Sequence, residues 1–315
     1  MYKDRMFENE NEYLSFLART GIPSDAGHVY WVVQKSKAFY QDYIYNKQFV
    51  YSDGTIAVHT DSGDGKGIQN AINACKGGRN DYVFVGTGNY NLSAALTLAG
   101  KSSVHLVGLN GGGVEVGTLG AAALTQTGAF ENVIMEAYCE LTGLQIINKN
   151  GYSAVTIAAG KWRPNVHNNC FHMVAGSAIN IIDATGALAC SYGRICNNRF
   201  ATWVGGDLTS AINVGTGTGV DICKNVITQY NGTMDYGIIQ AGAQCIVKDN
   251  VVSDCGGGGV VTVAVQLYEY SSAISNRLSV PAGRGLAGGT AAKGFVDNMD
   301  GATGAGNGSA SNLET

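Results

Sequence analysis

The stretch Ile195-Cys-Asn-Asn198-Arg-Phe200 returns several times in the second half of this chain. Its copies are Val166-His-Asn-Asn169-Cys-Phe171, Ile222-Cys-Lys-Asn225-Val-Ile227, Val247-Lys-Asp-Asn250-Val-Val252, Ala273-Ile-Ser-Asn276-Arg-Leu278 and Phe295-Val-Asp-Asn298-Met. From Asn169 to Asn298 the successive asparagines are separated by 29, 27, 25, 26 and 22 residues. A pattern that recurs at such a period indicates one structural unit stacked on itself.

A second series of short β-branched runs lies out of phase with the asparagines. Its members are Ser153-Ala-Val-Thr-Ile157, Ser177-Ala-Ile-Asn-Ile181, Ser210-Ala-Ile-Asn-Val214 and Tyr236-Gly-Ile-Ile-Gln240. Each repeat therefore contains at least two strands, joined at turns. A leucine-rich or helical solenoid would need helical periodicity in each repeat, and the sequence has none.

These repeats predict an all-β fold, a parallel β-helix of about eight coils over residues 82–299. Each strand would lie about 4.8 Å from the equivalent strand of the next coil, so that equivalent residues form columns. A column of asparagines can bond from side chain to side chain along the axis, and asparagine also tolerates the left-handed backbone of a sharp corner. We therefore predict a structural ladder made of Asn169, Asn198, Asn225, Asn250, Asn276 and Asn298.

The first 60 residues differ from the repeats. Residues 7–19 have the pattern of a short helix, and residues 28–59 are rich in aromatic side chains. A turn at residues 52–55 and the run Ile56–His59 indicate a strand after a hairpin-like corner. The aromatic segment is either a small packed α/β module or an interface, because tyrosine and tryptophan are favoured interface anchors. The candidate interface residues are Tyr30, Trp31, Phe39, Tyr40, Tyr43 and Tyr45.

A helix is predicted just before the first coil. Ile68, Ala71, Ile72 and Cys75 have the spacing of an amphipathic helix, an N-capping side chain precedes them, and glycines 77–78 end the helix. The glycine-rich sequence before Ile68 resembles a phosphate-binding loop. The GK[ST] ending of such loops is absent, so we do not predict a nucleotide site.

Composition limits the possible partners. Of the 315 residues, 45% are hydrophobic and 14% are charged, and the net charge of −4 is opposite to that of a nucleic-acid-binding surface. The chain has no long apolar stretch for a membrane span and no apolar core of a signal peptide near residue 1, so we expect synthesis in a cytoplasm. The eight cysteines form no CxxC pair. We expect them to be small buried thiols, with no disulfide, metal or cofactor.

These features together resemble the right-handed β-helix superfamily of pectate lyases and phage tailspikes over about residues 60–300. The resemblance rests on Gly67-Ile-Gln-Asn-Ala-Ile-Asn-Ala74, on Tyr82-Val-Phe-Val-Gly-Thr-Gly-Asn-Tyr-Asn-Leu92 and on the repeated asparagine corners. It implies a right-handed helix whose first coil is covered by the capping helix. The beginning, Met1-Tyr-Lys-Asp-Arg-Met-Phe-Glu-Asn-Glu-Asn-Glu-Tyr with Gly27-His-Val-Tyr-Trp31, resembles structural proteins of environmental tailed phages.

The predicted organisation has four parts. Residues 1–60 form an attachment module, 61–80 the capping helix, 81–300 the β-helix, and 301–315 a Gly/Ser-rich tail. The resemblance implies a homotrimer in a virion made in the host cytoplasm, in contact with other capsid or tail proteins and with host surface polysaccharide.

Catalytic motifs are weak in the coils. The Asn-Thr-Asp, Asp-Asp, Gly-His-Gly and Arg-x-Lys motifs of polygalacturonases are absent. Asp221 and Asp249 belong to adjacent repeats but lie at different positions in them, and His167 and His172 flank an asparagine corner as ordinary polar residues would. Our leading hypothesis is a non-enzymatic virion protein, either a capsid decoration protein or a tail spike or fibre. One alternative is a polysaccharide-cleaving tailspike, with two carboxylates in one groove. The other is a carbohydrate-binding surface with rows of aromatic residues, for which the coils supply few candidates: Trp162, Tyr192, Trp203, Tyr230, Tyr236, Tyr268 and Tyr270.

Overall fold

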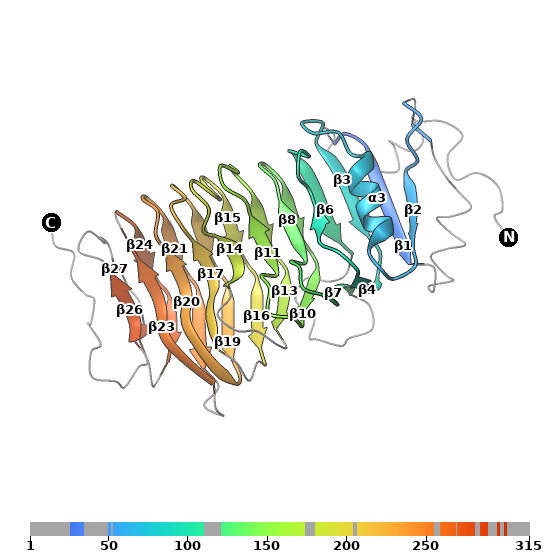
Figure 1. Ribbon diagram of the computed structural model, residues 1–315. Helices are drawn as coiled ribbons and strands as arrows, with labels where there is room; N and C mark the ends of the chain where they lie inside the picture. The colour runs from blue at the N-terminus through green and yellow to red at the C-terminus, as the bar shows by residue number, and fades with distance from the viewer. Residues whose placement is uncertain are drawn as a thin grey trace.

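The chain forms a stack of parallel coils (Figure 1). The structure is a computed structural model that describes residues 26–34, 50–51, 53–109, 121–173, 180–203, 207–254, 259–268, 270–280, 284–288, 295–296 and 299–300. Three long parallel sheets run along the stack, and each of the eight coils between Asp81 and Gly288 adds one strand to each sheet. The prediction of an all-β parallel solenoid of about eight coils is confirmed, and its form is consistent with a right-handed β-helix.

The three sheets have 11, 9 and 8 strands. The 11-stranded sheet contains, in spatial order, β2 (Val58–Asp61), β1 (Val29–Gln34), β3 (Asp81–Val85), β6 (Val104–Gly108), β9 (Glu140–Thr142), β12 (Asn165–His167), β15 (Arg194–Cys196), β18 (Asp221–Cys223), β21 (Ile246–Lys248), β24 (Ser272–Ile274) and β27 (Phe295–Val296). The 9-stranded sheet contains β4 (Gly88–Leu92), β7 (Ala122–Gln126), β10 (Gln145–Asn148), β13 (Cys170–Met173), β16 (Arg199–Thr202), β19 (Val226–Gln229), β22 (Val251–Asp254), β25 (Arg277–Ser279) and β28 (Met299–Asp300). The 8-stranded sheet contains β5 (Leu96–Thr97), β8 (Val133–Met135), β11 (Val155–Ile157), β14 (Asn180–Ala184), β17 (Leu208–Val214), β20 (Gly232–Gln240), β23 (Gly259–Leu267) and β26 (Arg284–Gly288).

The interior is filled by columns of apolar side chains, one residue from each coil. In the 9-stranded sheet Phe171 and Phe200 are paired in register, and their rings stack with centroids 4.8 Å apart. Ile146 precedes them in the same column and Ile227 follows, and all four side chains are fully buried. Coils stack because burying such a column removes apolar surface from water on both sides of every coil.

The asparagine column is buried and fully hydrogen-bonded. The Nδ2 group of Asn198 donates to Asn225 Oδ1 (3.1 Å) in the next coil and to the Val166 carbonyl (2.8 Å) in the previous one. Its Oδ1 accepts from the backbone N–H (3.1 Å) and the Nδ2 (3.2 Å) of Asn169. Asn225 and Asn250 repeat this arrangement. Asn276 Oδ1 accepts from the N–H and Nδ2 of Asn250, and Asn276 Nδ2 donates to the Val247 carbonyl. An amide side chain has two donor hydrogens and two acceptor lone pairs, so every capacity is used. Asn298 lies outside the described residues.

The left-handed residue at this corner is not the ladder asparagine. It is the residue immediately before it in each coil, namely Asn168, Asn197, Lys224, Asp249 and Ser275, with φ between 52° and 57°. Our sequence argument gave both tasks to one asparagine, which is wrong. The two tasks belong to different residues. The ladder asparagine points into the coil and makes the hydrogen bonds along the axis, whereas the residue before it has the left-handed backbone of the corner.

The register of the 8-stranded sheet differs from the sequence alignment at one rung. Val155, Ile182 and Ile212 are paired with one another, so Asn180 lies opposite Ser210. Matching residues 177–181 to residues 210–214 by sequence instead places Ser177 opposite Ser210, which is three residues before the observed partner Asn180. The interior column decides the register, because Ile182 fills the position between Val155 and Ile212, and the likeness of residues 177–181 to residues 210–214 is accidental.

The capping helix covers the first coil, and its N-terminus binds an internal carboxylate. Helix α3 (Lys66–Ala74) buries Ile68, Ala71 and Ile72 against the end of the stack. Its N-cap residue Gly65 has φ 82° and provides no side-chain bond. Instead, the buried Asp61 carboxylate accepts five backbone N–H bonds of 2.6–3.2 Å, from Gly63, Asp64, Gly65, Gly67 and Ile68. The loop that resembles a phosphate cradle is therefore filled by the chain's own carboxylate.

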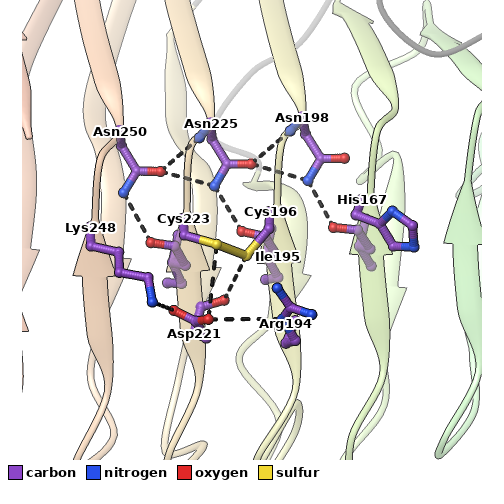
Figure 2. Close-up of a disulfide and its surroundings, with 12 residues drawn as sticks. His167, Arg194, Ile195, Cys196, Asn198, Asp221, Cys223, Asn225, Lys248 and Asn250 are labelled. Carbon is purple, nitrogen blue, oxygen red and sulfur yellow. Dashed lines mark hydrogen bonds and ion pairs between the residues drawn. A yellow bond between two sulfur atoms is a disulfide. The ribbon is translucent and has the colours of Figure 1, made fainter.

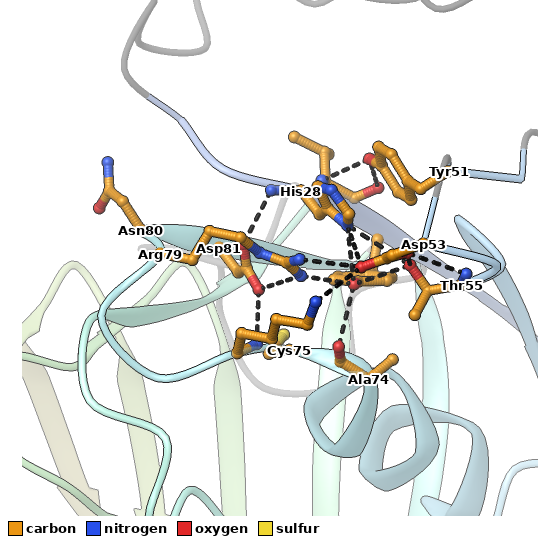
Figure 3. Close-up of polar contacts among 12 residues, drawn as sticks. His28, Tyr51, Asp53, Thr55, Ala74, Cys75, Arg79, Asn80 and Asp81 are labelled. Atoms are coloured by element: carbon orange, nitrogen blue, oxygen red, sulfur yellow. Dashed lines mark hydrogen bonds and ion pairs between the residues drawn. The ribbon is translucent and has the colours of Figure 1, made fainter.

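A buried ion pair joins the N-terminal segment to the cap (Figure 3). Asp81 accepts bonds from Arg79 Nε (2.6 Å) and Nη2 (2.7 Å), and also from the backbone N–H groups of His28 and Lys76, both at 2.8 Å. Arg79 Nη2 also lies 2.9 Å from the Tyr30 hydroxyl, which donates to the Ala74 carbonyl at the end of α3. One carboxylate therefore fixes the beginnings of two strands and the end of the helix.

The described part of the N-terminal segment extends the β-helix. Strand β1 lies between β2 and β3 in the 11-stranded sheet and pairs in parallel with both. The expected corner at residues 52–55 appears as an antiparallel bridge between Val50 and Ile56. The expected helix at 7–19 and the tail at 301–315 lie outside the described residues. Among the described residues, no helix is long and apolar enough to cross a membrane.

Candidate functional site

The outer face of the 11-stranded sheet gathers most of the chemically active side chains. The middle residue of each short strand points inward, and its two neighbours point outward in two columns. The first column contains Tyr82, His105, Glu140, Asn165, Arg194, Asp221, Ile246 and Ser272. The second contains Trp31, Phe84, Val107, Thr142, His167, Cys196, Cys223, Lys248 and Ile274.

Glu140 lies between two histidines on this face. Its Oε2 is 2.6 Å from His105 Nδ1, and its Oε1 is 2.5 Å from His167 Nε2. The outer nitrogen of each ring is also bonded, because His105 Nε2 lies 2.6 Å from Asn80 Oδ1 and His167 Nδ1 lies 2.9 Å from Asn168 Nδ2. The two imidazoles bind opposite oxygens of one carboxylate, and this arrangement holds all three side chains in place.

The histidines keep Glu140 ionised. Burial alone raises the pKa of the Glu140 carboxyl, but the hydrogen bonds from His105 and His167 and their charges outweigh burial and lower the pKa from 4.5 to about 2. A carboxyl group with such a pKa stays deprotonated near neutral pH, where a general acid must carry a proton. The arrangement suits a structural anion better than a proton donor.

Replacing Glu140 by glutamine should change how stability depends on pH. Because the folded-state pKa of Glu140 is depressed, its contribution is present above about pH 4.5 and is lost as the pH falls towards 2. Over that interval the wild-type chain should lose roughly 2–3 kcal/mol more unfolding free energy than Glu140→Gln. Denaturant unfolding at a series of pH values measures this difference, and parallel curves for the two chains would contradict it.

An aromatic platform continues this face towards the cap. Tyr82 stacks on His105 with ring centroids 4.1 Å apart, and Phe84 stacks on Trp31 at 4.9 Å. Of the six candidate interface residues, Trp31 lies on this partly exposed platform, and Tyr30 is fully buried. Phe39, Tyr40, Tyr43 and Tyr45 lie outside the described residues.

Further along this face, beyond Glu140, two cysteines differ from the prediction (Figure 2). Cys196 and Cys223 are paired in register on β15 and β18 and form a disulfide. The prediction that all cysteines are free thiols is therefore wrong for this pair. Equivalent positions in adjacent coils bring the two side chains together. The other cysteines among the described residues are free and buried, and Cys255 lies outside them.

A separate row of exposed aromatic side chains follows the corner that leads into the 11-stranded sheet. Tyr138, Trp162 and Tyr192 come from three successive coils and are 48%, 45% and 52% exposed. The Tyr138 N–H donates to the Trp162 carbonyl (2.8 Å), and the rings of Trp162 and Tyr192 are 6.1 Å apart. The Tyr192 ring lies against Gly219 at the corresponding corner of the next coil, because a Cβ placed on Gly219 would be only 2.8 Å from that ring. Tyr270 occupies the equivalent corner three coils beyond Tyr192 and is 62% exposed.

A second aromatic cluster lies just after the ends of strands β16 and β19 of the 9-stranded sheet. Trp203 and Tyr230 stack face to face with ring centroids 4.2 Å apart, and His172 meets the Trp203 ring edge-on. Burial lowers the pKa of His172, which favours its neutral form. This pair spans two coils, and it is separate from the row formed by Tyr138, Trp162 and Tyr192.

The acidic residues considered from the sequence do not form a close pair. Asp221 is paired with Ile246, and Asp249 lies at the left-handed corner beyond β21. On the outer face Glu140 and Asp221 share a column but lie three strands apart, about 14 Å at the usual strand spacing. The carboxylates of a glycosidase lie about 5–10 Å apart.

Comparison with known proteins finds no matching family model, no similar curated protein and no similar solved structure.

Proposed function

We propose that the protein is a structural component of a phage virion, a capsid decoration protein or a tail spike or fibre. Its β-helix acts as a non-enzymatic scaffold, and one corner of that scaffold contacts host surface polysaccharide. The virion setting and the homotrimeric state follow the sequence resemblance to tailspikes and phage structural proteins. The contact surface follows from the arrangement of the exposed side chains.

The observation that carries the contact surface is the row formed by Tyr138, Trp162 and Tyr192. Rows of exposed aromatic residues on a soluble protein mark interaction sites. The rings come from successive coils, which are spaced about 4.8 Å apart, close to the length of one sugar unit in an extended glycan. An extended polysaccharide lying along the helix axis could place one sugar against each ring.

The outer face of the 11-stranded sheet supports the scaffold role. Glu140 is held by two histidines and stays ionised, and the polar side chains of the asparagine ladder bond to one another inside the stack. These groups have partners within the protein that serve stability. A catalytic role for any of these groups would require it to exchange protons with a substrate, which its partners inside the protein oppose.

Substitutions in the aromatic row should weaken glycan binding. The Kd of Trp162→Ala and Tyr192→Ala for the capsular or exopolysaccharide of the propagating host should rise about tenfold, the effect of losing roughly 1.4 kcal/mol of ring contact. Isothermal titration of the purified chain measures Kd. Trp203→Ala is the matched control, because Trp203 is equally exposed but lies outside the row. Unchanged binding in both row variants would reject this surface.

Two further experiments test the rest of the proposal. A density map of the particle should place copies of this chain on the capsid lattice or at the tail, and its absence from the particle would overturn the virion assignment. Incubation with the host polysaccharide should release no reducing ends. Release of reducing ends would instead establish the alternative, a tailspike-type depolymerase.

A further inference from the structure

The disulfide at the outer face belongs to a cluster of three potential metal ligands. Cys196 and Cys223 lie side by side on β15 and β18, with Cα atoms 4.5 Å apart. Asp221 precedes Cys223 by two residues on the same strand and therefore points to the same side (Figure 2). The ligand atoms of the three side chains all lie within 4.8 Å of one another.

The carboxylate of Asp221 has an unused acceptor. Its Oδ1 is buried and accepts no hydrogen bond, although Lys248 Nζ lies 3.5 Å away. Arg194 Nε is 3.8 Å from the other oxygen, Oδ2. A buried carboxylate oxygen without a hydrogen bond is costly, and a cation held between that oxygen and the neighbouring sulfurs would remove the cost.

Charge in the cluster depends on the state of the cysteines. In the disulfide form Asp221 faces the cations of Arg194 and Lys248, and the sulfurs are neutral. In the reduced form the same two cations favour the thiolates, as positive neighbours do. Two thiolates and one carboxylate then exceed the two cations by one negative charge, which attracts a divalent ion.

We propose that the reduced protein binds a thiophilic divalent cation, such as Zn²⁺, through Cys196, Cys223 and Asp221. Two Zn–S bonds of about 2.3 Å at a tetrahedral angle place the sulfurs about 3.8 Å apart, a separation that side chains on adjacent strands reach. Three protein ligands leave the fourth position for water. This inference is independent of the proposed virion function.

Disulfide and metal exclude each other, so the site is controlled by redox state. A dithiol transfers two electrons and two protons to the disulfide, giving two cysteine thiols and the oxidised cyclic dithiol. The metal then displaces both thiol protons. In the reverse direction, an added small-molecule disulfide takes two electrons from the two thiolates and two protons from water and leaves as two thiols, while the Cys196–Cys223 disulfide forms and releases the ion.

Cadmium titration tests the site, because thiolate bonds to Cd²⁺ produce a charge-transfer absorption. The chain is reduced, freed of reductant without air and titrated with Cd²⁺. We expect one ion per chain with the absorption of two thiolates, and none for the oxidised chain. Cys196→Ser and Cys223→Ser should each lose most of the absorption. Asp221→Asn should keep the absorption but bind at least about tenfold more weakly.

Cys170→Ser is the matched control. Cys170 is a free cysteine on the outer side of the neighbouring sheet, and burial raises the pKa of its thiol, so its removal should leave the titration unchanged. Circular dichroism checks that each variant is folded. If a cysteine variant does not fold, the wild-type chain still decides, because binding must disappear on oxidation and return on reduction. The site would be rejected by a reduced chain without the absorption, or by a double Cys196→Ser, Cys223→Ser chain that retains it.

Discussion

Asn198→Asp should destabilise the protein by about 4 kcal/mol, a large share of the stability of an ordinary domain. The new carboxylate has no hydrogens to donate, so its second oxygen faces the Val166 carbonyl and Asn225 Oδ1. Two favourable bonds become contacts between acceptors, and a negative charge is buried in a column without a cation. Guanidinium unfolding followed by circular dichroism measures the loss.

The residue before it provides a matched control. Asn197 is exposed and has φ 57°, a backbone conformation that aspartate also tolerates. Asn197→Asp therefore makes the same chemical change one residue away and should alter the unfolding free energy by less than about 0.5 kcal/mol. Equal effects at residues 197 and 198 would mean that the column contributes no more than an exposed corner does.

Acid should partly rescue Asn198→Asp. A carboxyl group buried without a cation has a raised pKa, and its protonated form regains one donor hydrogen. The difference in stability between the variant and the wild type should therefore shrink as the pH falls from about 7 to about 4. A difference that is constant over this range would locate the damage in packing rather than in charge.

The repeat could be predicted from the sequence because the same residue type, asparagine, occupies the same buried position in successive coils. Asn169, Asn198, Asn225 and Asn250 each precede an apolar strand and occupy equivalent sites, so their spacing gives the coil directly. The division of tasks at the corner could not be predicted in the same way. Asn168 and Asn197 are also asparagines, and only the direction of the side chain separates the left-handed residue from the bonded one.

The clusters on the outer face of the 11-stranded sheet were harder to predict, because the number of residues in each coil decides which outward side chains meet. His105, Glu140 and His167 are separated by 35 and 27 residues in the sequence. That they lie on three neighbouring strands becomes apparent only when the strands and their register are known. The third strand of each coil is likewise hidden, since loops between the sheets vary in length. Cys196 and Cys223 are different. Both follow an isoleucine at the same point of the repeat, so the spacing alone places them side by side, although our sequence analysis expected free thiols.

A second large effect is expected at the cap. Asp61→Asn should destabilise the N-terminal end by roughly 3–5 kcal/mol, because one of the two acceptor oxygens becomes an NH₂ group that faces backbone N–H donors. At least two of the five N–H groups then lose their partner inside the protein, and the carboxylate no longer complements the positive end of α3.

Because coils contact only their neighbours, the damage from Asp61→Asn should be confined to the stack near α3. Hydrogen exchange should therefore accelerate in α3, β2 and β3, while β16 and β19 stay protected. Asp64→Asn is the matched control, since Asp64 lies three residues later in the same loop, and its carboxylate accepts one exposed backbone bond and pairs with the exposed Lys66. Uniform acceleration along the whole stack would show that the cap and the coils unfold as one unit. Unchanged exchange in Asp61→Asn would show that the five bonds to Asp61 do not hold the cap in place.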